Sequence, residues 1–426
     1  MIGTNEPAWL RNGRSQSDLL LVRPVRQEGI ETMAEVYVIA QGGGPTAVIN
    51  QTLVGAALEA RRRVPGCVVL GARHGVRGIR KGDYADLSAM PEAELMRIAA
   101  TPGAALGSTR DKPDAAYCTE VLAGLRRAKA TNFIYIGGND TAGTQLILRD
   151  AAGPGIAFTH APKTIDNDLA ESDHTPGFIS AAQFVAGAFL SLDLDFRALP
   201  GIYVGIVMGR HAGFLTASAA GWQRDASEGP HLIYVPEIAF SVDRLKDDIA
   251  RMFTKHGRCV VAISEGVGDE AGRPLAESLI ARDRLEIDAH GNTQLSGGDL
   301  GLVLQERLKG WFPGKRARVD TFGYLPRGYI GAISPIDQSE AFAAGACAVE
   351  VCAQGGGSVA LQFDGKLCRP VRVELESVAG KTRLLPRSYL DGDPTQLGAA
   401  GRAYFARLLA PRPATGVSLL NGGPGK

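Results

Sequence analysis

Residues 131–151 read TNFIYIGGNDTAGTQLILRDA, and they combine a strand-like run, two glycines and a helix-like run. The run that ends at Ile136 is rich in β-branched and aromatic residues, which is typical of a buried strand. Gly137 and Gly138 then leave the backbone bare, and the residues from Thr141 onward favour a helix. A strand that leads through glycines into a helix is the repeating unit of an α/β fold.

The same succession recurs along the chain. Strand-like runs followed by polar or glycine-containing loops occur at residues 35–44, 67–75, 155–168, 203–213 and 258–268. Their alternation with helical segments predicts parallel sheets with helices on both faces, which is an α/β fold of the doubly wound, Rossmann-like class. Ligands bind such sheets at the carboxyl ends of the strands, where the glycine-rich and acidic loops of this chain would lie.

The pattern divides the chain into a tail and two α/β domains. We interpret residues 1–32 as a disordered tail or as an overlong start, in either case without a chemical role. Their one apolar run is too short for the core of a signal peptide. The first domain is predicted over residues 33–177 and the second over residues 178–327, with the polar stretch ESDHTPGF as the crossing. Residues 328–385 would complete the first domain, and residues 386–426 would complete the second.

Composition narrows the class of partner. The formal net charge is +1, which argues against a nucleic-acid-binding protein because such proteins usually carry a basic surplus. The six cysteines form no CxxC pair, so we expect reduced thiols in a cytoplasmic protein. No apolar run approaches the length of a membrane span, and we therefore expect no membrane association.

Two glycine loops are candidates for phosphate binding. In QGGGPT, the run from Gly42 to Gly44 lies between a strand and a helix, where backbone N–H groups can approach an anion. A plain tight turn explains this loop equally well. In GGNDT, the oxygens of Asn139 and Asp140 suit Mg²⁺, although either residue could instead cap the helix.

The loop PKTIDND carries a more specific signal. Asp166 and Asp168 place two carboxylates within three residues, directly after Lys163 and Thr164. A carboxylate can accept a proton from an attacking hydroxyl, and a lysine can neutralise phosphate charge. Phosphoryl transfer requires mostly positioning and charge neutralisation, so this loop indicates that reaction more strongly than a charged surface turn.

Six motifs occur in order from about Met33 to beyond Asp337: AQGGGPTAVIN, TPGAALGSTR, IGGNDT, PKTIDND, VMGRHAG and GYLPRG. Together they resemble the phosphofructokinase family, and specifically its pyrophosphate-dependent branch. The resemblance implies an active site in the cleft between two α/β domains, with donor and metal loops on the first domain and sugar-phosphate binding on the second. It implies reversible, Mg²⁺-dependent transfer of phosphate from pyrophosphate to the 1-hydroxyl of fructose 6-phosphate, a step of glycolysis and gluconeogenesis.

The roles of the family's residues transfer where the motifs match. Asp166 resembles the base that takes the proton from the sugar 1-hydroxyl, and Arg210 resembles the arginine that stabilises charge on the transferred group. The implied donor contacts are Gly43, Gly44, Arg110, Gly138 and Lys163. The implied sugar contacts are Thr164, Ile165, Asp166, Met208, Gly209, Arg210, Glu265, Arg318, Tyr324, Leu325, Pro326 and Arg327. The implied metal ligands are Asn139, Asp140 and Asp168.

Two positions indicate the donor. The ATP-using branch typically has glycine where Asp140 and Lys163 stand, because glycine leaves room for the nucleotide. Asp140 adds bulk and negative charge that would repel a nucleotide phosphate, and Lys163 offers an ammonium to pyrophosphate. Two residues depart from the family's pattern: Asn139 stands where aspartate is usual, and Ile206 stands where glutamate is common.

Two alternatives stay open at this point. The same chemistry could act on sedoheptulose 7-phosphate, because nothing in the sequence fixes the length of the sugar pocket. The chain could also be a non-catalytic sugar-phosphate-binding regulatory protein, for which Asn139 and Ile206 are the only support. The resemblance further implies a homodimer, in which Arg318 acts in the partner's pocket. Glu237 lies near the region where effectors bind in the ATP-using branch.

Overall fold

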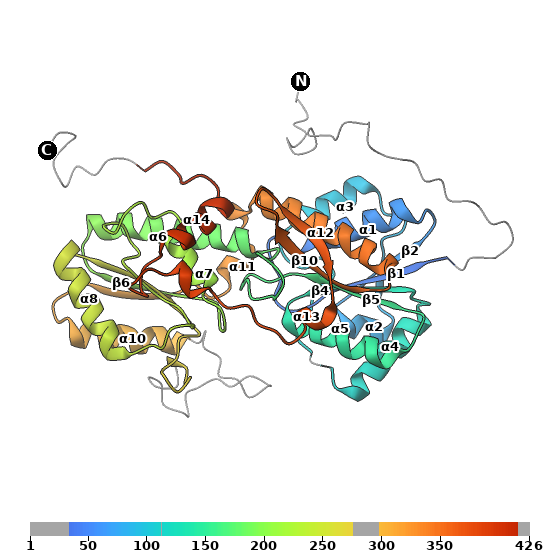
Figure 1. Cartoon of the computed structure of the whole chain (residues 1–426), viewed down its shortest axis with the longest axis horizontal. Coiled ribbons are helices and arrows are strands. Elements are labelled where there is room, and N and C mark those ends of the chain that lie inside the picture. Colours follow the sequence, from blue (N-terminus) through green and yellow to red (C-terminus); the bar gives the residue numbers. More distant parts are fainter. Residues whose placement is uncertain (1–33, 112, 276–297, 416–426) are drawn as a thin grey trace, which may run out of the picture. The chain divides into compact units, whose positions relative to one another are not determined.

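The computed structural model describes residues 34–111, 113–275 and 298–415. The tail predicted over residues 1–32 lies outside the described residues. By their contacts, residues from Glu35 onward form one compact unit, which contains both β-sheets of the protein (Figure 1). The fold is α/β, as the alternation of strands and helices predicts; the domain boundaries given above stay a prediction.

The first sheet has seven strands in the order β11-β10-β5-β4-β1-β2-β3. The pairs β10–β5, β5–β4, β4–β1 and β1–β2 are parallel, whereas the edge strands β3 and β11 pair in the antiparallel direction. The strands are β1 (Val36–Gln41), β2 (Val68–Ala72), β3 (Tyr84–Asp86), β4 (Asn132–Gly137), β5 (Ala157–Pro162), β10 (Gly357–Phe363) and β11 (Cys368–Val373). The expectation of purely parallel sheets is therefore wrong at both edges. At one edge a short connection joins β10 to β11, and short connections favour antiparallel neighbours.

Helices cover both faces of the first sheet (Figure 1). Tyr37 and Ile39 of β1 pack against the cluster that contains α1, α3 and α12, whereas Val38 and Ala40 pack against α2 and α4. The alternation follows from the two-residue period of a strand, and burial on both faces explains why β1 is apolar throughout. The helices are α1 (Ile49–Arg63), α2 (Val76–Lys81), α3 (Glu92–Ala99), α4 (Ala115–Arg127), α5 (Asn139–Ala152), α12 (Pro335–Ala353) and α13 (Leu375–Val378).

The second sheet has four parallel strands in the order β7-β8-β6-β9. Its strands are β6 (Ile202–Val207), β7 (Leu232–Tyr234), β8 (Cys259–Ser264) and β9 (Ala317–Thr321). One face of β6 packs against α8 and α10, and the other face packs against α6, α7 and α14. The helices are α6 (Phe178–Ala198), α7 (Phe214–Ala217), α8 (Val242–His256), α10 (Gly298–Trp311), α11 (Leu325–Gly328) and α14 (Ala399–Leu408).

Helix α6 corrects one expectation from the sequence. Its 21 residues are long and apolar enough, by length and composition, to cross a membrane, although no such run was expected. Half of the apolar window is buried inside the protein, and Phe178, Val185 and Phe189 belong to the core beneath β6. Burial against a sheet accounts for this composition, because a helix that packs on a core needs a wide apolar face.

Candidate active site

The predicted site residues follow the carboxyl ends of strands from both sheets. The glycine run follows β1, Gly138 and Asn139 follow β4, and Lys163 begins the loop after β5. In the second sheet, Met208 to Arg210 follow β6, Glu265 follows β8, and the segment with Arg327 follows β9. Register places β1, β4 and β5 side by side, so their loops meet at one edge of the sheet, as the fold class predicts.

Lys163 lies at the centre of the cationic side of the site. Its side chain is 3% exposed, and its Nζ atom donates to the carbonyl oxygen of Gly44 at 2.7 Å. Burial and the neighbouring charges of Arg327 and Arg110 lower the pKa of Lys163 to about 8. Burying an ammonium among other cations costs free energy, and a bound anion would relieve their mutual repulsion. The arrangement therefore indicates an anion-binding site.

The glycine run makes room for these cations. A Cβ atom on Gly44 would lie 3.0 Å from the guanidinium carbon of Arg327, and one on Gly43 would lie 3.2 Å from Lys163 Nζ. The N–H groups of Gly42 and Gly43 donate to the carbonyls of Ile136 and Thr109, so neither N–H is free for an anion. The expected approach of backbone N–H groups is therefore wrong for these two residues; their role is steric.

Gly138 fits a different purpose. A Cβ atom there would meet nothing closer than 3.6 Å, so the protein itself does not require glycine at this position. Gly138, rather than Asn139 or Asp140, is the N-cap residue of α5, and this excludes the capping explanation of those two side chains. The open space above Gly138, at a helix N-terminus beside the Lys163 loop, suits a phosphate.

Asp166 faces the cations. Burial raises the pKa of Asp166, while the positive charges of Arg327, Lys163, His211 and Arg210 act in the opposite direction. Its Oδ1 atom is buried and finds no hydrogen-bond partner among the described residues. A carboxylate with a raised pKa and a free oxygen is what a general base near neutral pH requires.

The residues around Asp168 fit a divalent metal. Burial and the charge of Asp166 raise the pKa of Asp168 to about 7, and Asp168 Oδ2 accepts from Asn139 Nδ2 at 3.1 Å. The Oδ1 atom of Asn139 is buried and has no hydrogen-bond partner within the part of the chain that the structure describes. Unpartnered oxygens of Asn139 and Asp166 beside a carboxylate suit a hard cation such as Mg²⁺. Asp140 is exposed and close enough to His211 to influence its pKa, so it lies at the rim of the site.

We expect Asn139→Asp to strengthen metal binding. The substitution replaces the hydrogen bond to Asp168 with a third carboxylate, which adds repulsion without metal and attraction with it. The Tm without divalent metal should fall, and the half-saturating Mg²⁺ concentration should fall on the order of tenfold, since 1.4 kcal/mol corresponds to tenfold. Thermal unfolding against Mg²⁺ at constant ionic strength measures both. A Mg²⁺ dependence equal to that of the wild type would contradict a role of residue 139 at the metal.

Hydrogen bonds shape the loop of Arg210. Gly209 has a φ of +131°, and its carbonyl oxygen accepts from Ser264 Oγ at 2.6 Å. Glu265, the next residue after Ser264, is buried, and burial together with the charge of Asp166 raises its pKa to about 7. Asp166, Arg210 and Glu265 therefore lie close enough to influence one another electrostatically.

Other predicted contacts have mixed placements. Ile165 and Met208 are buried in one apolar cluster, and Thr164 Oγ1 accepts from the N–H of Asp166 at 3.1 Å. Arg318 is exposed, and its Nη1 atom donates to the carbonyl of Ala317. Among the described residues, no hydrogen bond or ion pair joins Arg318 to the cluster around Asp166.

The segment GYLPRG presents two of its apolar side chains to solvent. Pro326 is buried, but Tyr324 is 56% exposed and Leu325 is 62% exposed. The guanidinium of Arg327 lies 4.2 Å from the centre of the Tyr324 ring, so the tyrosine holds the arginine that reaches the glycine run. Tyr324 thus has a structural contact as well as the predicted sugar contact.

Sequence reasoning missed residues that act behind the site. The sequence shows Ser264 only as the residue before Glu265, and no motif predicts its hydrogen bond to Gly209. Glu237 was considered near an effector site, yet its Oε1 atom accepts from the N–H groups of Gly213 and Leu385 at 2.9 and 2.7 Å. Ile206 is buried in the core that faces α8 and α10, so this departure from the family's pattern lies away from the site.

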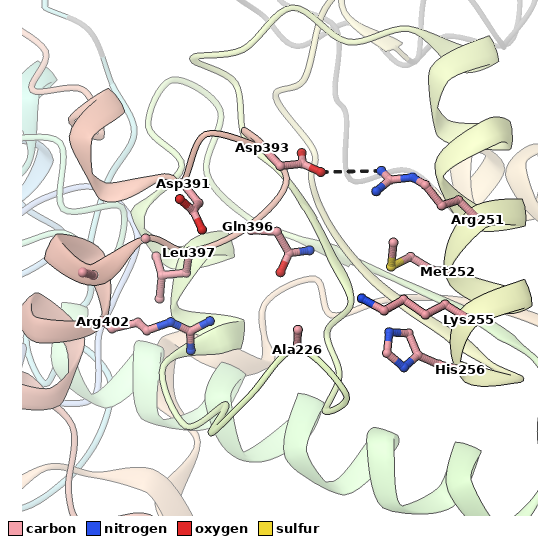
Figure 2. A pocket seen from close by; sticks show the side chains of 12 residues that line it. Ala226, Arg251, Met252, Lys255, His256, Asp391, Asp393, Gln396, Leu397 and Arg402 are labelled. Atoms are coloured by element: carbon pink, nitrogen blue, oxygen red, sulfur yellow. Dashed lines mark ion pairs between the residues drawn. The ribbon is translucent and has the colours of Figure 1, made fainter.

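A separate cavity of about 350 Å³ lies between the end of α8 and residues 391–402 (Figure 2). None of the predicted site residues lines it. Arg251, which lines it, pairs with Asp393 across the cavity at 3.5 Å. The remaining lining residues are Ala226, Met252, Lys255, His256, Asp391, Gln396, Leu397, Gly398, Ala399 and Arg402.

Comparisons with known proteins identify the family of the chain. The phosphofructokinase family model matches residues 36–352. The chain is 48% identical over 360 residues to a pyrophosphate–fructose 6-phosphate 1-phosphotransferase of Rhodospirillum rubrum, covering 83% of this chain and 89% of the relative. It is 34% identical to the enzyme of that name from Xanthomonas campestris, covering 87% and 90%. The crystal structure of a pyrophosphate-dependent phosphofructokinase from Nitrosospira multiformis superposes with a TM-score of 0.76 at 26% identity, covering 92% and 95%. The chain belongs to the phosphofructokinase family.

Proposed function

We propose that this chain is a pyrophosphate-dependent phosphofructokinase. It transfers a phosphoryl group reversibly between pyrophosphate and the 1-hydroxyl of fructose 6-phosphate, giving fructose 1,6-bisphosphate. The names of its relatives in Rhodospirillum and Xanthomonas support both substrates. The observation that carries the proposal is the buried Lys163 with Arg327, which together face the carboxylate of Asp166.

Asp166 is the general base. It accepts the proton of the sugar 1-hydroxyl while that oxygen attacks the transferred phosphorus. Burial raises the pKa of Asp166, which makes its carboxylate a stronger base, and the surrounding positive charges of Arg327 and Lys163 oppose that rise. Glu265, buried beside it, accepts a hydrogen bond from the sugar, as the family resemblance implies.

The cations hold and neutralise the phosphates. Burial and the charges of Arg327 and Arg110 lower the pKa of Lys163, and burial and the charge of Arg110 lower the pKa of Arg327. These three side chains would surround pyrophosphate. Arg210, in the loop held by Ser264, stabilises the charge that develops on the transferred group. Asp168 and Asn139, with Asp166, would hold Mg²⁺, which supplies charge neutralisation to the phosphate oxygens when bound.

The direct test is turnover by the purified chain with Mg²⁺ and fructose 6-phosphate. We expect product with pyrophosphate as the donor and no product with ATP. Turnover with ATP alone would keep the family and overturn the donor assignment. Binding of fructose 6-phosphate without turnover with either donor would favour the non-catalytic alternative.

Lys163 should make pyrophosphate binding depend on pH. Its pKa of about 8 means that the free enzyme loses this charge as the pH rises through 8. The KM for pyrophosphate of a Lys163→Met variant, divided by that of the wild type, should therefore fall towards one between pH 7 and pH 9.5. Pyrophosphate itself titrates equally in both assays, so the ratio isolates Lys163. A ratio near one at every pH would show that the charge of Lys163 does not contribute, whereas a constant ratio well above one would show that Lys163 keeps its charge up to pH 9.5.

The acceptor is the finer part of the proposal. Fructose 6-phosphate has the support of the relatives' names, and sedoheptulose 7-phosphate is the second candidate because it presents the same reacting end. A comparison of kcat/KM for the two sugars decides between them. A ratio in favour of the seven-carbon sugar would leave the site chemistry unchanged and correct the substrate.

We also propose that the enzyme acts as a cytoplasmic homodimer. The support is local: within the described residues Arg318 is exposed and its side chain bonds only the carbonyl of Ala317. The apolar side chains exposed nearby in sequence are Tyr324, Leu325, Tyr329 and Ile330. A second copy would cover these side chains and could receive Arg318 in its pocket. Mixing an inactive Asp166 variant with an inactive Arg318 variant should restore part of the turnover, whereas no recovery under subunit exchange would argue against a shared site.

A further inference from the structure

Residues 382–404, near the C-terminus, contact both the loop of Asp166 and the loop of Arg210. Residue 382 pairs with Leu169, and the N–H of Arg383 donates to the carbonyl of Asp168 at 2.8 Å. The guanidinium of Arg383 lies 4.4 Å from the ring centre of Phe214, which begins α7 directly after the loop of Arg210. The loop of Asp166 and the loop of Arg210 therefore share one neighbour.

Tyr404, on α14, makes the same link by itself. Its hydroxyl accepts from Asn167 Nδ2 at 2.9 Å and donates to the carbonyl of Asp173 at 2.8 Å. Its ring centre lies 6.1 Å from that of Phe214. Asn167 stands between the two aspartates of the catalytic loop, is completely buried, and has a φ of +60°. A left-handed backbone at a residue other than glycine costs free energy and persists only where its surroundings fix it.

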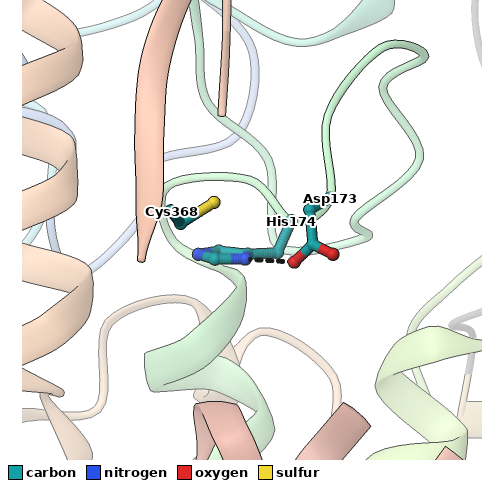
Figure 3. A group of neighbouring side chains, drawn as sticks. All are labelled: Asp173, His174 and Cys368. Atoms are coloured by element: carbon teal, nitrogen blue, oxygen red, sulfur yellow. Dashed lines mark hydrogen bonds and ion pairs between the residues drawn. The ribbon is translucent and has the colours of Figure 1, made fainter. Parts of the chain in front are cut away.

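Asp173, whose carbonyl accepts from the Tyr404 hydroxyl, is itself held by ion pairs. Asp173 Oδ1 accepts from His174 at 2.9 Å (Figure 3). It also accepts from Arg407 at 2.6 Å, and the second ring nitrogen of His174 lies 2.5 Å from Glu340. Burial alone would lower the pKa of His174, but its hydrogen bonds to Asp173, Cys368 and Glu340 hold the pKa well above the ordinary value.

Asp173, His174 and Cys368 lie close enough together to hold a metal ion. The ion pairs favour a different explanation, because both ring nitrogens of His174 already have partners. Two carboxylates are balanced by the imidazolium and by Arg407, so the cluster is satisfied without an ion. The cluster is an anchor for the backbone of Asp173, to which Tyr404 donates.

We propose that Tyr404 is a positioning residue, whose hydroxyl fixes the catalytic loop through Asn167 while its ring packs against the helix that follows the loop of Arg210. It touches no substrate. It sets how the general base and the charge-stabilising arginine lie relative to each other, and phosphoryl transfer depends steeply on such alignment. The inference rests on the proposed function, because its readout is that turnover.

The test compares Tyr404→Phe with Tyr389→Phe. Both rings belong to one aromatic cluster, with centres 5.1 Å apart, but the hydroxyl of Tyr389 makes no hydrogen bond with the described residues. We expect Tyr404→Phe to lower kcat about tenfold with both KM values within about twofold, since misalignment affects the reacting state more than binding. Tyr389→Phe should leave kcat and both KM values within about twofold of the wild type.

A second variant shows whether the effect passes through Asn167. Asn167→Gly tolerates the positive φ and removes the side-chain donor. In that background, Tyr404→Phe should lower kcat by less than about twofold, because the link is already broken. Equal kcat values for Tyr404→Phe and Tyr389→Phe, or additive effects with Asn167→Gly, would overturn the inference. Wild-type enzyme without turnover would instead refute the proposed function.

Discussion

Asp166→Asn should lower kcat about 10³-fold, within the range that general bases contribute. The substitution keeps the shape of the side chain and removes the basic oxygen. Among the described residues the Oδ1 atom of Asp166 has no hydrogen-bond partner, so the substitution removes an oxygen available to the substrate and to the metal rather than one that holds the fold. The KM for fructose 6-phosphate should change little, because Arg327 and the loop of Arg210 remain.

The measurement is steady-state turnover in both directions, with calorimetric binding of fructose 6-phosphate as the control for folding. A further control is Asp364→Asn, which alters an exposed carboxylate in the turn between β10 and β11 and should leave kcat within about twofold. A kcat for Asp166→Asn within tenfold of the wild type would reject Asp166 as the base. Loss of sugar binding together with turnover would indicate that Asp166 mainly orients the sugar.

Lys163→Gly should lower kcat/KM for pyrophosphate on the order of 100-fold or more, since a buried charge-assisted contact to an anion contributes about 3 kcal/mol. Lys163 Nζ is held at the carbonyl of Gly44, close enough to Arg327 and Arg110 for their charges to lower its pKa. Lys163→Met retains the volume and should show the same loss, which separates charge from packing. Lys366→Gly, at an exposed lysine, serves as the control for an ordinary substitution.

Use of ATP should appear only when both donor positions change. Asp140 is exposed at the rim of the site, near His211, where its charge would meet a nucleotide phosphate. The double variant Asp140→Gly, Lys163→Gly should therefore gain measurable ATP-dependent turnover, whereas Lys163→Met with intact Asp140 should not. ATP turnover by the Lys163→Met variant would show that Asp140 does not exclude the nucleotide.

Much of the fold follows from local pattern alone. The strands around Ile39, Ile134 and Val204 are apolar because both faces are covered, and that continuous burial is legible in sequence. Glycines and carboxylates directly after these strands point to the edge where parallel strands end. The antiparallel direction of β3 was not predictable, because a three-residue edge strand carries no signal of its direction. The short connection between β10 and β11, in contrast, favours the antiparallel pairing that these strands show.

The sequence by itself determined the reaction class and the residue types that carry it, because PKTIDND and VMGRHAG place their chemistry within a few consecutive residues. Tertiary structure alone decided how those residues are held. Lys163 reaches Gly44 across 119 residues, and Tyr404 reaches Asn167 across 237. Such long-range hydrogen bonds produce no periodic pattern in the sequence, because each partner is a common residue type within its own segment. The physical reason is that pattern reports burial and backbone geometry, whereas hydrogen bonds and charge balance depend on which segments the fold brings together.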